Sequence, residues 1–255
     1  MKRSSKEFKA EAREALIGNY GTYIGSYLIY TLISVVINLF IYWYLLISNS
    51  ELIAITGLII SFLFGVLTNL IKVGLRKTAL SISRHQPIRI GDLFYGLTHH
   101  PDRFLVVELI MGLVYGLFTY LPIFFYTNYR LSGMITDFNF YQPTPEDIVT
   151  FAFSYTAGIL LITAAGVLIA SLLMMPFALS VYLLIDNQEL SSIGALKESA
   201  RMMKGNMGRY FYLSYLSFLG YYCLGYLGSM IPLLWIYPYK EVTLSNFYRE
   251  LKQEI

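Results

Sequence analysis

The sequence has 255 residues, of which 56% are hydrophobic and only 14% are charged. A typical soluble domain carries about 25% charged residues, so this composition excludes an ordinary soluble protein. The formal net charge is only +3, and the single cysteine, Cys223, excludes a disulfide within the chain.

Five stretches of the chain contain no charged residue: 15–50, 52–71, 109–129, 148–185 and 210–239. A spanning helix needs roughly 20 apolar residues, because the hydrocarbon core is about 30 Å thick and a helix rises about 1.5 Å per residue. Runs such as "LLITAAGVLIASLLMM" lack the alternation of barrel strands. The first run is also too long for a cleaved signal peptide. We therefore predict one all-α, polytopic membrane domain over 1–255, with six spans of which the last two are short.

The first predicted unit, residues 1–71, begins with a short basic helix. Phe8, Ala12 and Ala15 recur at helical spacing and form an apolar stripe beside charged residues. Such a helix prefers the membrane interface, with its apolar side toward the acyl chains. The chain then turns at "LIGNYGTY", which begins at Leu16, and the first two apolar runs form a hairpin.

The second predicted unit, residues 72–185, begins with a basic loop. The loop contains "IRIGDLFYGLTHHPDRF", which we interpret as a degenerate copy of the interfacial helix because Leu93, Phe94 and Leu97 make it amphipathic. The runs 109–129 and 148–185 form the second hairpin. Thr144 and Pro145 predict the start of its second helix, and Pro176 predicts a kink near the inner side.

The third predicted unit, residues 186–255, begins with an amphipathic helix over 192–204, followed by "MKGNMGRY". The last apolar run, 210–239, is too long for one untilted span and short for two. It contains Gly228 and Pro232, so we predict two short helices, about 210–227 and 230–239, before the tail. A single tilted helix with an external tail is the alternative.

Basic residues predict the orientation of the chain. They gather in the N-terminal segment and in the loops after the second and fourth runs, whereas the intervening connections contain almost none. Because positive loops stay cytoplasmic, the N-terminus is predicted inside and the first four runs cross out, in, out and in. Lys240, Arg249 and Lys252 of the tail place the C-terminus in the cytoplasm as well.

One joint occurs twice in the sequence, at an offset of 187 residues. The aligned pairs are Glu11 with Glu198, Gly18 with Gly205, Asn19 with Asn206, Gly21 with Gly208, and Tyr23 with Tyr210. Glycine tolerates the left-handed backbone that ends a helix, and asparagine can bond the freed backbone groups. We interpret Gly18, Asn19, Gly21, Gly205, Asn206 and Gly208 as structural elbows from an interfacial helix to a spanning helix. Chance similarity within a membrane composition is the alternative.

The composition of the predicted interfacial helices indicates which partners the protein binds. Their basic side chains are candidates for binding anionic lipid headgroups, a simpler partner than nucleic acid for loops beside spans. These candidates are Lys9, Arg13, Lys197, Arg201, Lys204 and Arg209. On the outer side, the aromatic segment "FNFYQPTPED" is a candidate surface for a protein partner.

The sequence contains no catalytic, cofactor-binding or metal-binding constellation. His85, His99 and His100 share one loop but lack a third ligand at useful spacing. The spans contain essentially no ionisable residue except Glu108, which we expect to pair with Arg103 or to face the cytoplasmic mouth, and to be dispensable for folding. We therefore expect no enzymatic activity, no cofactor and no metal.

Three segments carry a resemblance to a known family. They are "AREALIGN" at 12–19, "ESARMMKGN" at 198–206 and the ending "PYKEVTLSNFYREL" at 238–251. In these segments the chain resembles DUF975, a family of uncharacterised Gram-positive bacterial membrane proteins, over nearly its whole length. The segment after the second joint is Tyr-rich here, where the family is often Trp-rich. The resemblance implies a six-helix protein of the bacterial plasma membrane and implies no chemistry.

Two functions remain open at this point. The first is a non-enzymatic membrane protein that binds lipid or protein partners, in envelope homeostasis or peptide immunity. The alternative is a transporter or translocator of a lipid or hydrophobic peptide, which a repeated structure and an interrupted last run favour.

Overall fold

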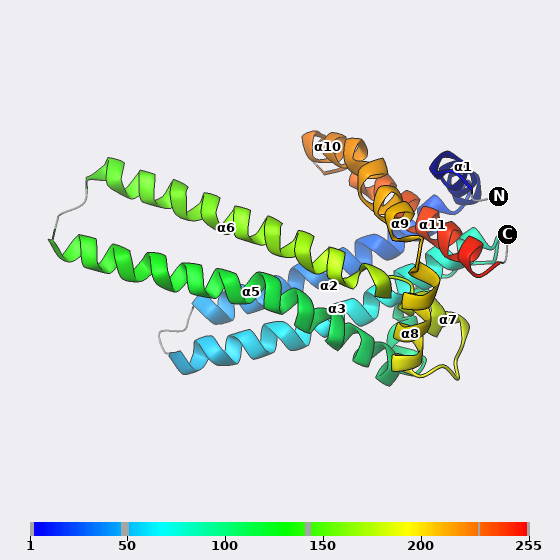
Figure 1. Ribbon diagram of the computed structural model, residues 1–255, viewed down its shortest axis with the longest axis horizontal. Coiled ribbons are helices and arrows are strands. Elements are labelled where there is room, and N and C mark those ends of the chain that lie inside the picture. The colour runs from blue at the N-terminus through cyan, green and yellow to red at the C-terminus, as the bar shows by residue number, and fades with distance from the viewer. Residues whose placement is uncertain (1–2, 47–50, 141–143, 229, 254–255) are drawn as a thin grey trace. The chain divides into compact units, whose positions relative to one another are not determined.

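The computed structural model describes residues 3–46, 51–140, 144–228 and 230–253, and these residues form helices and turns without a strand. The all-α prediction is therefore confirmed for this part of the chain, whose elements Figure 1 shows in order. The helices are α1 (Ser5–Leu16), α2 (Tyr20–Leu46), α3 (Glu51–Ser83), η1 (Ile90–Phe94), α4 (Tyr95–Thr98), α5 (Pro101–Phe140), α6 (Pro145–Met174), η2 (Met175–Phe177), α7 (Ser180–Asp186), α8 (Ser192–Met203), α9 (Met207–Ser214), η3 (Leu216–Phe218), α10 (Leu219–Leu227) and α11 (Leu233–Leu251).

The chain forms two compact units, and each is described by itself. The first contains Met1–Leu109 together with Pro176–Ile255, and the second contains Ile110–Met175. All the predicted elbow and lipid-headgroup residues belong to the first unit.

Four helical stretches of the described residues are long and apolar enough to cross a membrane: Tyr20–Tyr44, Ile59–Ser83, Pro101–Arg130 and Pro145–Asp186. They correspond to the first four predicted spans. The last apolar run is divided among α9, η3, α10 and the start of α11, so the fifth and sixth spans stay a prediction. Helix α10 ends at Leu227 and α11 begins at Leu233, so the helices are interrupted where Gly228 and Pro232 predict an interruption.

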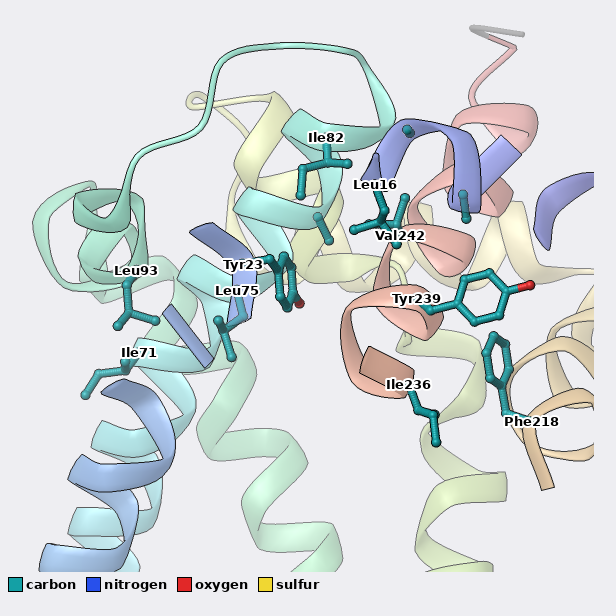
Figure 2. Packing of buried hydrophobic residues seen from close by; sticks show 13 residues of the cluster. Leu16, Tyr23, Ile71, Leu75, Ile82, Leu93, Phe218, Ile236, Tyr239 and Val242 are labelled. Carbon is teal, nitrogen blue, oxygen red and sulfur yellow. The ribbon is translucent and has the colours of Figure 1, made fainter. Parts of the chain in front are cut away.

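The core of the first unit is built around the two helices α3 and α11. Tyr23 of α2, Leu75 of α3, Leu93 of η1 and Val242 of α11 are at most 1% exposed and belong to one cluster, which Figure 2 shows at close range. Leu16 brings α1 into the same cluster. The apolar side chains of six elements therefore share one core at the end of the α2–α3 hairpin that the basic residues predict to be cytoplasmic.

Helix α1 packs against α11 and α3 rather than lying free at the interface. Its apolar residues Phe8, Ala12 and Ala15 are at most 3% exposed, and the Phe8 ring lies edge-on to Phe247 of α11 with centroids 5.9 Å apart. The prediction that this stripe faces acyl chains is therefore wrong. The physical reason is packing density. A protein core is packed more closely than a liquid hydrocarbon, so these apolar side chains make more contacts in the core than against acyl chains.

Helix α3 continues well beyond the second apolar run. Lys72, Arg76 and Lys77, which the sequence places in a cytoplasmic loop, lie on this helix, which ends at Ser83. Element η1 packs closely on this helix at Gly74, where an added Cβ would overlap the backbone carbonyl of Leu93. The predicted loop is thus partly an extension of the span, and only the residues after Ser83 leave it.

The second unit is a hairpin of α5 and α6, which run side by side in Figure 1. Gly166 of α6 lies against the Phe118 backbone, where an added Cβ would overlap the carbonyl oxygen, so the helices approach closely. Tyr115 Oη and Ser171 Oγ lie 3.0 Å apart across the hairpin, and Tyr126 Oη donates to the carbonyl of Ser154 at 3.2 Å. Small residues and interhelical hydrogen bonds therefore hold this unit together.

The ends of α6 follow their predicted signals. Thr144 caps the helix by accepting from the Asp147 backbone amide, and Pro145 occupies the first turn. At the other end α6 stops at Met174 and Pro176 lies in the 3-10 segment η2, as expected for a residue without an amide hydrogen. Of the predicted outer aromatic segment 138–147, residues 141–143 lie outside the described part of the chain.

Candidate functional site

The two predicted joints have the same backbone geometry. Gly18 has a φ of +82° and Gly205 a φ of +79°, both in the left-handed region. The side-chain amide of Asn19 donates to the Ala15 carbonyl at 3.0 Å, and that of Asn206 donates to the Met202 carbonyl at 3.1 Å. Each joint therefore ends a helix with glycine and satisfies one of its last carbonyls with asparagine.

The remaining elbow residues lie just after each turn. Gly21 and Gly208 belong to the first turns of α2 and α9, and neither has a positive φ. The backbone amides of Tyr23 and Tyr210 donate to Asn19 and Asn206, at 3.1 and 2.9 Å. In each copy the asparagine therefore ends one helix and starts the next.

The correspondence between the two segments extends back to the start of each helix. Helices α1 and α8 both have 12 residues, and each begins after a capping serine, Ser4 or Ser191. Each serine hydroxyl accepts from the backbone amide three residues later, Glu7 or Gly194. A sequence signal exists at the first cap, where Ser4 and Glu7 form a capping box, whereas Ser191 has a glycine three positions later and gives no such signal.

A related joint separates α4 from α5. His99 has an extended backbone, and His100 follows with a φ of +51°, as the extended Ile17 precedes Gly18. Pro101 then begins α5. The element before this joint consists of η1 and the single turn α4, so it is shorter and less regular than α1 or α8.

Helix α8 presents a row of basic residues to the surface. Lys197 and Arg201 are exposed and lie four positions apart, which places them on one helix face, and the exposed Lys204 follows as the residue that caps the helix. The opposite face, with Ala195 and Met203, is buried. The acidic side chain of Glu198 lies 3.8 Å from Arg201, and both side chains are well exposed. This face therefore keeps a strong positive charge.

The other predicted headgroup residues divide into two kinds. Arg13 is exposed on α1. Lys9 instead donates to the Ser217 carbonyl at 2.5 Å and lies 4.3 Å from the Phe218 ring centre. Burial lowers the pKa of Lys9, and the nearby charge of Arg13 lowers it further. Lys9 therefore binds its own protein.

Arg209 also has partners within the chain. It donates to Glu250 Oε1 at 2.8 Å and to the Arg3 carbonyl at 3.0 Å. Its guanidinium also lies 5.5 Å from the centre of the Phe247 ring. It joins the start of α9 to the end of α11.

A second ionic cluster joins α3, α7 and α11. Asp186 accepts two bonds from Arg84, at 2.7 and 2.6 Å, one from Tyr248 Oη at 2.8 Å and one from Lys252 at 2.7 Å. These residues are 102, 62 and 66 positions from Asp186 in sequence. No local sequence signal could have revealed this pairing.

Charged residues also lie inside the first unit, at one end of the candidate spans. Arg76 Nη1 is 3.8 Å from Glu108 Oε1, and the Glu108 side chain is only 10% exposed. Lys72 lies one turn before Arg76, and Glu241 of α11 is close enough to interact electrostatically with both cations. Because Lys72 and Arg76 belong to the candidate span Ile59–Ser83, the expectation of essentially uncharged spans is wrong at this end.

Glu108 therefore has a different partner from the one expected. Arg103 instead donates to the carbonyls of Gln188 and Leu190 in the connection before α8. The difference arises because α3 continues as a helix and brings Arg76 beside the start of α5.

The hydroxyl of Tyr23, in the core of the first unit, is buried without a hydrogen bond to any described residue, which is uncommon. It is fully buried, and it has no hydrogen-bond partner within the described part of the chain. Burying an unpaired hydroxyl costs roughly 1–3 kcal/mol.

Among the described residues no three histidine, cysteine or acidic side chains gather to hold a metal ion. His99 stacks on Tyr95 with ring centroids 4.4 Å apart, and His85 and His100 both occupy turns with positive φ. His85 thus lies in the turn after α3, whereas His99 and His100 are neighbours in the joint before α5, one in ring packing and one in the turn.

The comparisons with known proteins agree with the resemblance seen in the three segments. No curated protein and no solved structure matches the chain. The family model described as "Protein of unknown function (DUF975)" matches residues 1–254, which is almost the whole chain. The protein therefore belongs to the DUF975 family.

Proposed function

We propose that this protein is a non-enzymatic, multi-pass protein of the bacterial plasma membrane that binds anionic lipid headgroups at its cytoplasmic face. The observation that supports the proposal is the basic surface of α8, where Lys197 and Arg201 share one exposed side of a helix packed on the protein by its other side, and the exposed Lys204 follows at the helix end. Each basic residue near an anionic leaflet contributes about 1 kcal/mol of attraction.

The buried side of α8 makes this surface a rigid one. Ser199 donates to the Pro176 carbonyl at 2.8 Å and accepts from the Leu179 amide at 3.1 Å, so α8 is held against the end of the fourth candidate span. The joint at Gly205 then leads into α9. The cations of α8 thus have fixed positions beside a candidate span. Such fixed cations are suited to binding the phosphate groups of lipids in the adjacent leaflet.

Native mass spectrometry of the purified protein with added phosphatidylglycerol or phosphatidylcholine tests this proposal. We expect Lys197→Gln with Lys204→Gln to reduce the bound phosphatidylglycerol several-fold and to leave phosphatidylcholine binding unchanged. The matched control is Lys6→Gln with Arg89→Gln, which removes two exposed cations elsewhere in the same unit. Equal losses in both double variants would show that net charge, not the α8 face, attracts the lipid.

A further inference from the structure

Three helices of the first unit border a pocket of about 370 Å³ that is separate from the α8 surface. Helix α11 packs against both α1 and α9, and the pocket lies where the start of α1 meets the start of α9. Ligand pockets commonly have volumes of about 300–1,000 Å³, so this one has room for a small molecule or a lipid headgroup. Its lining includes Arg3, Ser5, Phe8, Gly208, Arg209 and Tyr212.

The charged side chains that line this pocket are both cations. They are Arg3 and Arg209, and no carboxylate of the described residues lines the pocket. Both guanidiniums lie near the Phe8 ring, with their central carbons 5.3 and 6.0 Å from its centre, so the two cations share one small region. Phe8 and Phe247 are at most 1% exposed and form an apolar part of the wall. The pocket therefore combines two cations with an aromatic surface.

Carboxylates outside the lining hold the two arginines in place without using all their N–H groups. Arg3 Nη2 is 2.8 Å from Glu11 Oε2, and Arg209 Nη2 is 2.8 Å from Glu250 Oε1. Arg209 Nη1 also donates to Asn206 Oδ1 at 3.3 Å. Within the described part of the chain, Arg3 Nη1 and Arg209 Nε have no hydrogen-bond acceptor. The two side chains are 29% and 25% exposed, so these donors remain available to a bound anion.

Two hydroxyl groups of the lining add further donors. Ser5 Oγ and Tyr212 Oη have no hydrogen-bond partner among the residues that the structure describes. Ser4, by contrast, donates to Glu7 Oε1 at 3.0 Å as part of its cap. A group that satisfies two guanidiniums and two hydroxyls needs several acceptor oxygens and a negative charge.

A phosphate group has this chemistry. Its oxygens accept parallel N–H bonds from a planar guanidinium, which is why arginine is the usual residue for recognising phosphate. The pocket is also larger than a phosphate group alone needs. The Phe8 and Phe247 rings therefore leave an apolar surface for the organic group to which the phosphate is esterified.

We propose that the pocket between α1 and α9 binds the phosphate group of an ester, with Arg3 and Arg209 contacting its oxygens. The ester is either a soluble molecule of the cytoplasm or the headgroup of an inner-leaflet phospholipid, since the basic residues predict this side of the protein to be cytoplasmic. No described residue of α8 lines the pocket. Loss of lipid binding at α8 therefore leaves this proposal standing, and loss of phosphate binding here leaves the α8 proposal standing.

Isothermal titration calorimetry of the full chain in amphipol tests the pocket with two phosphate probes. Glycerol 3-phosphate is the soluble ester, and dihexanoyl phosphatidylglycerol is the lipid. Glycerol and dihexanoylglycerol are their phosphate-free counterparts. The lipid is titrated into the Lys197→Gln, Lys204→Gln variant, so that the α8 surface does not contribute. We expect one phosphate probe to bind one-to-one and at least tenfold more tightly than its counterpart, and the probe that does so identifies the source of the phosphate.

Gly208 offers a way to fill the pocket without breaking its ion pairs. It lines the pocket, and no heavy atom lies within 4 Å of the place where its Cβ would stand. The matched control is Gly21, the corresponding residue of the first joint, which has equally open space and lies outside the pocket. We expect Gly208→Leu to weaken phosphate binding at least tenfold and Gly21→Leu to keep it within about twofold of wild type. Equal losses in the two variants, or a wild-type protein that binds neither phosphate probe more tightly than its counterpart, overturn the proposal.

The role of the cations has its own test. Arg209→Gln with Glu250→Gln removes a guanidinium and its carboxylate together, so neither is left without its partner. We expect this variant to melt near wild type and to bind the phosphate probe at least tenfold more weakly. The control is Lys6→Gln, which removes an exposed cation of α1 outside the pocket and should change binding by less than about twofold. Unchanged binding in the double variant, or an equal loss in Lys6→Gln, contradicts Arg209 as a phosphate contact.

A milder variant keeps the test independent of the ion pairs. Ser5→Ala with Tyr212→Phe removes only the two unpaired hydroxyls, and both side chains are at least partly exposed, so the fold should melt as wild type does. We expect a several-fold loss of phosphate binding. Wild-type binding by this variant shows that the two hydroxyls do not contact the phosphate and contradicts that part of the site.

Discussion

Gly18 and Gly205 are 187 positions apart in the sequence and adopt nearly the same left-handed backbone, with φ of +82° and +79°. Neither glycine has a heavy atom within 4 Å of the place where a Cβ would stand. Space therefore does not limit the residue at either position, and only the backbone conformation does. Substitutions at Gly18 and Gly205 therefore test the backbone conformation of the two elbows without a steric clash.

We expect Gly205→Val to lower the amount of stable membrane protein clearly, and Gly205→Asn to lower it much less. A β-branched residue opposes a positive φ by roughly 1–2 kcal/mol, whereas asparagine enters this region readily. The same order is expected for the two changes at Gly18. Abundance in membranes and melting in detergent measure both series. Indistinguishable valine and asparagine variants at both positions would contradict the left-handed elbow.

We expect the C-terminus to lie in the cytoplasm, since α11 ends beside the N-terminal segment. Arg249 lies 3.4 Å from Glu11 of α1, and the Arg3 amide donates to Glu250 at 3.2 Å. A reporter enzyme that is active only outside the cell should give no signal at this terminus. The same fusion placed after the first predicted span is the positive control. A strong C-terminal signal would support the single tilted helix instead.

We expect Glu108→Gln to destabilise the protein by about 1–2 kcal/mol, because it leaves Arg76 without its carboxylate. This variant therefore also tests the sequence-based expectation that Glu108 is dispensable for folding. The double change with Arg76→Gln should recover part of the loss. Detergent melting compares the three proteins, and a single variant as stable as wild type would show that the 3.8 Å pair contributes little.

We expect Asp186→Asn to destabilise the first unit by about 2–4 kcal/mol. Its side chain is only 8% exposed and binds Arg84 and Lys252, so the substitution leaves partly buried cations without their anion. The control is Glu198→Gln, which breaks the exposed pair with Arg201 and should cost less than about 1 kcal/mol. Similar losses in the two variants would show that Asp186 does not organise the ends of α3, α7 and α11.

Local chemistry in the sequence was sufficient for much of the helical organisation. Apolar runs longer than a bilayer core predict the first four candidate spans, because backbone groups in lipid must be satisfied within a helix. Thr144 with Pro145 predicts the start of α6, and Pro176 predicts a kink near the place where α6 gives way to η2, because caps and prolines act on neighbouring residues. The left-handed glycines at the joints have a local cause as well.

Only the tertiary structure decided which faces meet. The stripe of Phe8 and Ala12 is apolar in either case, but whether it covers lipid or α11 depends on a partner more than 200 residues away. Likewise, Arg76 is basic in the sequence, yet its position beside Glu108 follows from the continuation of α3 and the approach of α5. Periodicity and capping describe one segment at a time, whereas burial and ion pairing are properties of two segments brought together by the fold.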